Sequence, residues 1–528
     1  PQNLPTSSVA SGVWSLGEQA EASRDGIWPI PKLGWVAWYE PVYNSNSSYG
    51  IIQNGISIDV DSNDNVAVQF MQHDQTTSPD SRYTTVAYIN GATETQTWVK
   101  NQGVNSASAS GKYFISPPAT SYSGVIFDSS DELVIGAATI SLTSGDGWAS
   151  VSGYNGIRGW LVMNWNKTNG AQLNYSKLLY NPSTNTYMNG TFCKGAQTAT
   201  TIFSASNNNN QGSLQITQTA KSNGALTSTQ TWTSPSGGAN AMNGGGGSNG
   251  YAVGAGYAWT SHGGANQAYH ATFITNIPGS TSNGNSYNLY QTAAPTVTTY
   301  GNDATWDGST MYCALNNGGS IASSTVAAIN TSTNAITWQQ SYKGTGASGQ
   351  SYPRGICVDS SGNTYMIGYC YATVSESGYN GIHSWIIKHN SAGVRQWTRM
   401  LDFQAKGSVN DNQPNDISID AAGEFIYVSI YAYVISGGAV ASNLAIAVKL
   451  ATDGSGTGTT TTTGDITTVY YYDGATYLIS GFASGAGSLS IQTNYMNNSG
   501  SDYVSITNST LPQTNTTPTP RPTNLAKI

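Results

Sequence analysis

A hairpin of two short apolar runs recurs along this 528-residue chain, and it constrains the fold more than any other feature. Its clearest copy covers residues 355–368, where two apolar runs flank the turn Asp359-Ser-Ser-Gly-Asn. The two serines suit the centre of a type I turn, and Gly362 supplies the left-handed residue that closes a three-residue loop with a bulge. Two further strands, over 383–389 and 394–401, complete a meander of about fifty residues, the size of one propeller blade.

The unit repeats along the chain. An aspartate opens the hairpin turn again at Asp61, Asp128, Asp307, Asp420 and Asp473. A tryptophan preceded by Thr or Gln marks the fourth strand at Trp98, Trp232, Trp338 and Trp397. Hairpin starts lie near 57, 125, 192, 250, 304, 356, 417 and 469, roughly 50 to 70 residues apart, which is typical of repeat architecture.

These units predict an all-β protein with one closed β-propeller of about eight four-stranded blades over residues 34–511. Seven blades is the fallback, if the two weak units at 192 and 250 form one blade. A segment at 35–39 has the fourth-strand pattern and competes with 502–508 for the outer place in the last blade. The sequence does not choose between them.

Composition excludes several classes of function. The formal charge of −8 and the pI near 5.0 disfavour nucleic-acid binding, which needs clustered Lys and Arg. No apolar run is long enough to span a bilayer, so no membrane partner is expected. The start of the chain, from Pro1, has no Sec-type signal, and we therefore expect synthesis and assembly in a cytoplasm. Four cysteines are too few for a disulfide scaffold and are expected to be free, strand-buried thiols: Cys193, Cys313, Cys357 and Cys370.

No catalytic constellation and no cofactor motif is predicted, so the chain is expected not to be an enzyme. The five histidines lack metal-ligand spacing. The repeated aspartates are expected to cap the hairpin turns rather than to act as acids. A weak calcium candidate is Asp59, Asp61 and Asn63, but the sixth loop position is Asp64 instead of Gly and the twelfth is Phe70 instead of Glu.

The two ends of the chain lie outside the repeat. Residues 1–33 are predicted to be an attachment arm, with Trp14, Leu16 and Trp28 as partner-binding residues, because tryptophan is favoured as an interface anchor. The alternative is that the two tryptophans pack on the side of the propeller. Residues 512–528, rich in Pro, Thr and Asn, are predicted to form an extended tail.

Two stretches resemble known families. The segments "GICVDSSGNTYMIG" and "NSAGVRQWTR" resemble the bacterial β-propeller repeat with an "IAVDSSGNVYVTG" core, which implies a propeller fold and no particular function. The N-terminal "GVWSLGEQ" followed by "WP" resembles a segment of structural proteins of tailed phages, notably those of cyanobacteria. That resemblance implies a virion protein.

Four hypotheses follow for the function. The first is a phage virion structural protein on the tail or tail fibre, present in several copies, held to other virion proteins by its arm and facing host-surface glycans with Tyr- and Asn-rich loops. The second is a capsid-decorating virion protein, and the third is a bacterial surface adhesin. The fourth, a propeller enzyme such as a quinoprotein dehydrogenase or a glycosidase, is disfavoured because a glycosidase needs paired carboxylates across a cleft. Partner identity at the arm would separate the first two.

Overall fold

The computed structural model places most of the chain. The residues that it describes are 34–39, 49–74, 81–102, 113–115, 124–128, 130, 132–142, 157–180, 188–208, 213–222, 226–233, 241–262, 266–276, 284–291, 296–318, 322–346, 349–373, 380–405, 408–436, 439–461, 466–480, 489–493, 497–498, 505–507 and 524–527.

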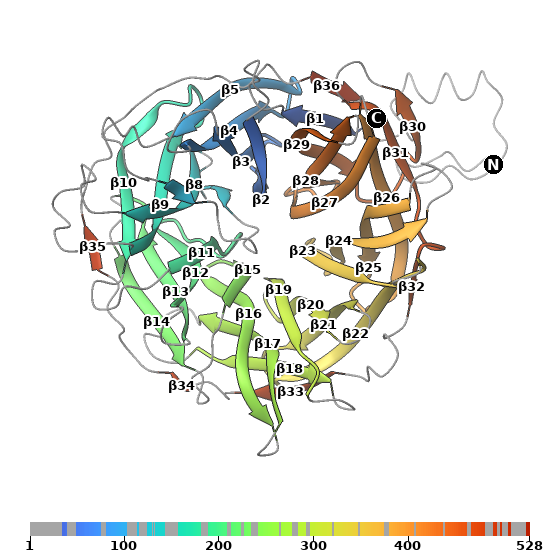
Figure 1. Ribbon diagram of the computed structural model, residues 1–528. Coiled ribbons are helices and arrows are strands. Elements are labelled where there is room, and N and C mark those ends of the chain that lie inside the picture. The colour runs from blue at the N-terminus through green and yellow to red at the C-terminus, as the bar shows by residue number, and fades with distance from the viewer. Residues whose placement is uncertain are drawn as a thin grey trace, which may run out of the picture.

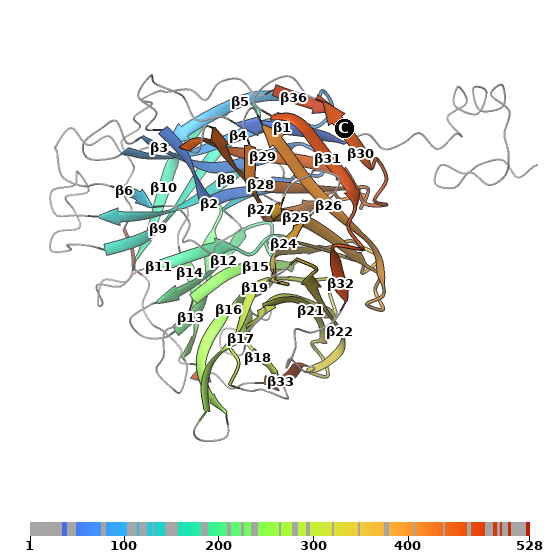
Figure 2. The same cartoon turned by 45° about the vertical axis from the view of Figure 1, so that its right-hand side comes forward.

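All secondary-structure elements in these residues are β-strands, and the strands form antiparallel sheets arranged radially in a ring (Figure 1). Figure 2 shows the same ring from an oblique angle. The prediction of an all-β propeller is confirmed. No helix in the described residues is long and apolar enough to cross a membrane.

The described strands form six sheets. The 11-stranded sheet contains two four-stranded units joined by one parallel pairing, of Ile382 with Asp411, so the strands are grouped here into seven blades numbered in chain order. Blade 1 contains β2 (Tyr49–Val60), β3 (Val66–Asp74), β4 (Ser81–Asn90) and β5 (Thr95–Gln102). Blade 2 contains β6 (Tyr113–Ile115), β7 (Val125–Phe127), β8 (Leu133–Leu142), β9 (Ile157–Asn166) and β10 (Gln172–Tyr180), with β6 and β7 both paired to β8. Blade 3 contains β11 (Met188–Phe192), β12 (Thr201–Asn208), β13 (Ser213–Ala220) and β14 (Leu226–Thr233).

Blade 4 contains β15 (Ala241–Ser248), β16 (Tyr251–His262), β17 (Asn266–Asn276) and β18 (Ser286–Gln291). Blade 5 contains β19 (Thr299–Trp306), β20 (Thr310–Asn317), β21 (Ser323–Asn330) and β22 (Ala335–Gly344). Blade 6 contains β23 (Ser351–Val358), β24 (Thr364–Thr373), β25 (Asn380–His389) and β26 (Arg395–Ala405). Blade 7 contains β27 (Ser408–Ile419), β28 (Phe425–Ser436), β29 (Ala439–Ala451) and β1 (Trp35–Tyr39).

Strand β1 closes the ring. It pairs antiparallel with β29, from Trp35 opposite Lys449 to Tyr39 opposite Ala445, and so becomes the fourth strand of blade 7. Of the two candidates for that place, the segment 35–39 therefore occupies it. Closure by a strand from the other end of the chain ties the first and last blades together through main-chain hydrogen bonds.

The eighth expected unit, from residue 469, does not form a blade in the described strands. Its strands are added one by one to the outer edges of earlier blades, and we call this series the belt.

The units at 192 and 250 form separate blades, so the reason given for the seven-blade fallback is wrong. The belt strands are β30 (Gly458–Thr461), β31 (Ile466–Asp473), β32 (Leu478–Ser480), β33 (Leu489–Thr493), β34 (Asn497–Asn498), β35 (Ser505–Thr507) and β36 (Asn524–Lys527).

The belt runs around the ring against the order of the blades. Strand β31 pairs with β26 of blade 6 and carries β30, and β32 pairs with β22 of blade 5. Strands β33, β34 and β35 then pair with β18, β14 and β10 of blades 4, 3 and 2. Strand β36 pairs with β1 on blade 7, so part of the expected extended tail is a strand (Figure 1, red strands on the perimeter).

The hydrophobic core lies between blades rather than in one central mass. One cluster joins blades 7 and 1 through Trp35, Ile58, Phe70 and Tyr427, and comparable clusters join blades 3 to 4, 4 to 5, 5 to 6 and 6 to 7. All four cysteines are free and buried, as predicted.

The predicted turn chemistry is confirmed at the central hairpin. Gly362 has φ 77°, and the Asp359 amide donates to the Asn363 carbonyl at 3.0 Å. Asp64 and Gly423 hold the same left-handed place in blades 1 and 7, with φ 61° and 69°. Gly and Asp are among the few residues that adopt this conformation at low cost.

In blades 1, 5 and 6 the tryptophan of the fourth strand joins the blade to the next one. The indole of Trp98 donates to the Lys167 carbonyl at 2.7 Å, and the indole of Trp338 donates to the Ser391 carbonyl at 3.1 Å. Trp397 does the same toward the Thr452 carbonyl at 3.2 Å. Lys167 and Ser391 belong to the turn between the third and fourth strands of the following blade, and Thr452 directly follows the third strand of blade 7. The recurrent tryptophan of the sequence is therefore an inter-blade contact.

Candidate functional site

A cavity of about 830 Å³ opens at the centre of the ring, on the side where the first two strands of each blade turn. Its walls come from the ends of the first strands and from the hairpin turns of several blades. One lysine, Lys194, lies among six aspartates: Asp59, Asp61, Asp128, Asp303, Asp307 and Asp359. The cavity is thus acidic by formal charge.

The turn aspartates cap their own hairpins, as predicted. The Asp359 carboxylate accepts the amides of Ser361 and Asn363, both at 2.9 Å. Asp61 does the same for Asn63 and Asn65 at 2.8 and 2.9 Å. The other turn aspartates accept the amide of a residue two to four positions along the chain: Asp128, Asp307, Asp420 and Asp473.

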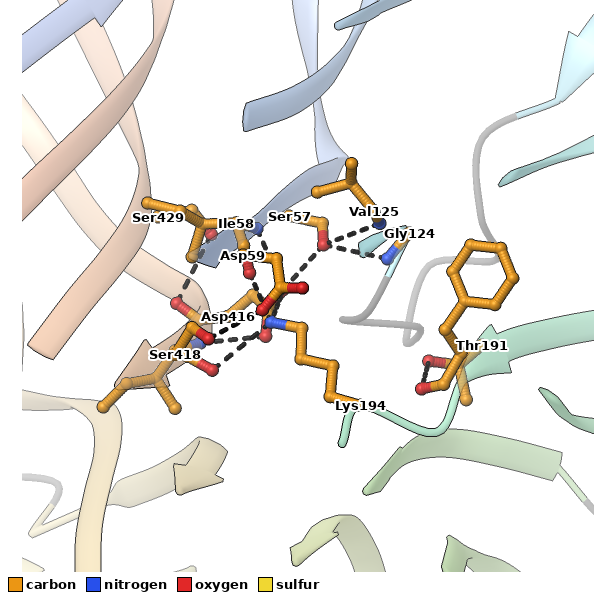
Figure 3. Close-up of polar contacts among 12 residues, drawn as sticks. Ser57, Ile58, Asp59, Gly124, Val125, Thr191, Lys194, Asp416, Ser418 and Ser429 are labelled. Atoms are coloured by element: carbon orange, nitrogen blue, oxygen red, sulfur yellow. Dashed lines mark hydrogen bonds and ion pairs between the residues drawn. The ribbon is translucent and has the colours of Figure 1, made fainter. Parts of the chain in front are cut away.

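Lys194 spans the cavity. It follows β11 in blade 3, but its ammonium donates to Asp416 Oδ2 of blade 7 at 2.6 Å and to the Ile417 carbonyl at 3.3 Å. A third hydrogen bond goes to the Ile58 carbonyl of blade 1 (Figure 3). The side chain of Asp416 is 1% exposed and that of Lys194 is 15% exposed. All three ammonium protons have oxygen partners, so Lys194 is a strut between opposite sides of the ring.

Asp416 and Asp303 occupy the same structural position in blades 7 and 5. Each follows a β-bulge in the first strand of its blade. Each accepts an amide from the first strand of the next blade: Asp416 from Ile58 at 3.0 Å, and Asp303 from Ile356 at 2.9 Å. Burial raises the pKa of Asp416, while Lys194 and the hydrogen bonds oppose that rise.

Asp59 makes a related contact from blade 1. Its carboxylate accepts the Phe127 amide of blade 2 at 2.9 Å and the Ser418 hydroxyl of blade 7 at 2.8 Å. Burial raises the pKa of Asp59, and the charge of Lys194 opposes that rise. Asp59 therefore joins three consecutive blades around the cavity. Figure 3 shows Asp59 near Lys194 and Ser418.

Asp303 differs from these residues because one of its oxygens lacks a partner. The residue is 5% exposed, and Oδ1 has no hydrogen-bond partner. Burial, with a smaller contribution from the charge of Asp416, raises the pKa of Asp303 to about 8, although the Ile356 amide and Lys194 oppose the rise. Near neutral pH this carboxyl therefore carries a proton.

The three residues of the calcium candidate do not converge on a common point. Asp61 Oδ2 accepts the Lys167 ammonium at 2.9 Å, Asp59 bonds to the neighbouring blades, and the Asn63 amide donates to Asp61. No three His, Cys, Asp or Glu in the described part of the chain gather closely enough to hold a metal ion. The predicted partner-binding residues Trp14, Leu16 and Trp28 lie outside the described residues.

Sequence reasoning missed Lys194, Asp303 and Asp416. Lys194 belongs to a weak unit, and its partner Asp416 is 222 positions away. A signal for the aspartates does exist, because Asn302-Asp303 and Asn415-Asp416 are Asn-Asp pairs at equivalent places in two units. Alignment of the units on their first strands, rather than on their turns, would have exposed it.

A second surface feature lies at the far ends of blades 4 and 5, away from the hairpin turns. Four aromatic residues there, all partly exposed, form what we call the aromatic cluster: Tyr257, Trp259, Tyr269 and Tyr300. Tyr257 meets Tyr269 and Tyr300 edge-on, with ring centroids 5.2 and 4.9 Å apart, and Trp259 meets Tyr269 at 4.6 Å. The cluster thus spans the seam between two blades.

Comparison with known proteins finds only distant structural similarity. No family model matches this chain, and no curated protein matches it. Among solved structures, the chain is similar to the Dos1 propeller, with 8% identity, a TM-score of 0.32, and coverage of 78% of this chain and 95% of that one. It is also similar to a polysaccharide lyase described as an ulvan lyase (10% identity, TM-score 0.38, 76% and 96% covered) and to a europium-containing methanol dehydrogenase (11%, 0.26, 74% and 74%). At these scores the likeness carries no argument about activity.

Proposed function

We propose that this protein is a non-enzymatic structural protein of a bacteriophage virion, associated with the tail or tail fibre. Its arm of residues 1–33 would bind other virion proteins, with Trp14, Leu16 and Trp28 as anchors. The virion would be assembled in the host cytoplasm and would carry several copies. The same fold would also serve a capsid-decorating protein or a bacterial surface adhesin, and these remain the alternatives.

The observation that best supports a structural role is the belt. An unpaired strand at a sheet edge is a template for pairing with another chain, and this hazard grows where many copies are held close together. In the described residues, belt strands cover the outer strand of six blades. The outermost strands of these blades are therefore short belt strands of two to five residues, and short edge strands lower the tendency to edge-to-edge association at the high local density of a virion.

The hydrogen bonds made by buried aspartates in and beside the cavity support the absence of catalysis in this proposal. Asp59, Asp61 and Asp416 accept hydrogen bonds from backbone amides or side chains of neighbouring blades and turns. Carboxylates used in this way hold the ring together. A glycosidase would instead need two carboxyl groups facing each other across a substrate.

The test keeps the full chain and changes only the arm. Trp14→Ala combined with Trp28→Ala should leave a folded, soluble propeller that no longer enters phage particles, because two interface anchors worth roughly 2 kcal/mol or more each are lost. Particle incorporation is measured by imaging and by mass spectrometry of purified virions. Unchanged incorporation would place the attachment surface elsewhere, and an unfolded variant would show that the arm clasps the propeller.

The aromatic cluster supports a second element of the proposal, contact with host-surface glycans. Aromatic rings offer flat apolar faces, and their hydroxyl groups supply polar partners, which suits sugar rings. Trp259→Ala with Tyr300→Ala should abolish binding to a glycan array of host-surface polysaccharides. Tyr371→Ala is the matched control, since Tyr371 is 36% exposed and lies on β24 outside the cluster. Equal binding by the cluster variant and the control would refute this element.

A further inference from the structure

Four consecutive blades carry a β-bulge at the same place in the first strand. The bulged residues in blades 4 to 7 are Asn243, Asn302, Arg354 and Asn415. Asn243 donates to the Gly301 carbonyl of blade 5 at 2.7 Å, and Asn302 donates to the Pro353 carbonyl of blade 6. An asparagine at this place therefore joins one blade to the next, and Arg354 departs from that pattern.

The contact between Arg354 and blade 7 does not account for an arginine at this place. The guanidinium donates to Gln413 Oε1 at 3.4 Å, which is long for a hydrogen bond, and the acceptor is an uncharged amide. The guanidinium carbon also lies 5.0 Å from the centroid of the Tyr369 ring, in a cation–π contact. Tyr369 stacks on Tyr352, its partner in the sheet, with ring centroids 5.0 Å apart. Arg354 and the two tyrosines are all partly exposed, so the rings hold a cation at the surface.

These tyrosines extend the aromatic cluster into blade 6. Tyr300 of the cluster and Tyr352 hold the same place in blades 5 and 6, since each lies two residues before the bulged residue of its strand. Strands β19 and β23, which carry them, are neighbours at the inner side of the ring (Figure 1). The hydrogen bond from Asn302 to the Pro353 carbonyl joins the two strands next to these positions. Aromatic rings of blades 4, 5 and 6 therefore follow one another along one side of the ring, with Arg354 among the rings of blade 6.

The combination of rings and a cation indicates the class of ligand. Aromatic faces pack against the apolar faces of sugar rings, and this contact does not depend on the charge of the sugar. A guanidinium presents five N–H donors in a planar fork that matches the oxygens of a carboxylate or of a tetrahedral oxyanion. A series of rings fits consecutive sugars of a chain, and a cation within the series fits an acidic group carried by one of them.

We propose that this side of the ring binds an acidic polysaccharide. Its sugar rings would pack on the aromatic cluster and on Tyr352, and a carboxylate or a sulfate ester would bind Arg354. The inference rests on the proposed contact with host-surface glycans and adds the class of glycan. The formal charge of −8 gives the protein as a whole no attraction for a polyanion. Preference for an acidic chain must therefore come from a local cation at contact distance.

The test measures the affinity of the full-length protein for matched acidic and neutral glycans by calorimetric titration. One pair is an oligogalacturonate and its methyl ester, and the other is a sulfated galactan oligosaccharide and its desulfated form. The wild type should bind the acidic member of one pair about tenfold more tightly than the neutral member, because charge-assisted hydrogen bonds are stronger than neutral ones. Preference in the first pair identifies a carboxylate as the acidic group, and preference in the second identifies a sulfate ester.

Arg354→Gln keeps a donor for Gln413 but removes the charge, so it should abolish the preference and leave binding of the neutral member unchanged. Arg354→Lys keeps the charge without the planar fork and should retain part of the preference. Arg399→Gln is the matched control, because Arg399 also lies over an aromatic ring, 5.7 Å from the Trp397 centroid, but on the fourth strand of blade 6. This control should keep the full preference.

Equal affinity of the wild type for the acidic and neutral members overturns this inference and leaves the proposed glycan contact intact. Absence of binding to all four glycans also overturns it, and a glycan array without bound glycans overturns the proposed contact as well. The inference fails too if Arg399→Gln loses the preference as Arg354→Gln does, or if Arg354→Gln weakens binding of the neutral member equally. A polyglutamate peptide that binds as tightly as the acidic glycan would replace the polysaccharide by an acidic protein segment.

Discussion

Replacing Lys194 by Met tests whether the strut holds the ring. The change leaves Asp416 buried without its cationic partner, and it removes donors from the carbonyls of Ile58 and Ile417. Removal of one partner of a buried ion pair costs about 3 to 5 kcal/mol. Because the Lys194 side chain keeps 15% exposure, we expect the lower end, a loss of roughly 3 kcal/mol in the free energy of unfolding.

The loss should depend on pH in a defined direction. Burial already holds the pKa of Asp416 above its ordinary 3.8, and removal of the Lys194 charge raises it further. A group with a raised folded-state pKa contributes stability at low pH and loses it as pH rises through that pKa. The variant should therefore approach the wild type as pH falls toward 4, and should differ most near neutral pH and above.

Urea unfolding followed by tryptophan fluorescence, at several pH values, measures this. The double variant with Asp416→Asn should recover most of the loss, because no buried charge remains unpaired. Lys343→Met, on β22 outside the cavity, is the matched control and should change stability little. A pH-independent loss, or no recovery in the double variant, would refute the strut.

Four further predictions concern stability and association. Gly393→Ala should cost roughly 2 kcal/mol in urea unfolding, because φ is 80° and the new Cβ would lie 2.4 Å from the Trp338 ring; a neutral result would contradict the inter-blade lock. Gly362→Val should lower the thermal midpoint, with a loss above about 1 kcal/mol, since a β-branched residue does not fit φ 77°; an unchanged midpoint would count against the turn assignment. Burial lowers the pKa of His389 from 6.5 to about 3, so wild-type stability should fall as pH drops from 6.5 toward 3, and His389→Gln should flatten that dependence in pH-resolved unfolding. Deletion of residues 458–528 should yield a protein that self-associates, as measured by light scattering, because the long outer strands of the blades lose their belt strands. A monomeric product would contradict the protective role of the belt.

Local chemistry made the blades predictable. The Asp-Ser-Ser-Gly-Asn turn fixes its own conformation through Asp359 and Gly362, so a short window of sequence contains the whole cause. The same holds for the tryptophan of the fourth strand, since Trp338 meets a turn that also repeats. A contact made within one repeat, or between equivalent positions of neighbouring repeats, produces a residue pattern that recurs along the sequence.

The belt and the strut leave no such trace. Strand β31 has the apolar pattern and Asp473-Gly474 turn of a first strand, yet its partner is β26. Strands pair at a sheet edge through main-chain hydrogen bonds. The side-chain pattern of a strand is therefore the same whether the strand begins a new blade or is added to the edge of an existing blade. The contact between Lys194 and Asp416 crosses the ring, and neither residue has a counterpart in every repeat.

The direction of the belt has a consequence for how the ring can be completed. A ribosome makes the blades in order from 1 to 7 and makes the belt after them, yet the belt runs back past blades 6, 5, 4, 3 and 2 before β36 reaches β1. Each belt strand needs a finished blade to pair with, and β36 needs β1 already seated against β29. Final fastening therefore waits for a whole chain with every blade in place. A truncated chain lacks the belt strands, so the outer strands of its blades stay unpaired. A protease that removes incomplete products could recognise the fragment by these unpaired edges.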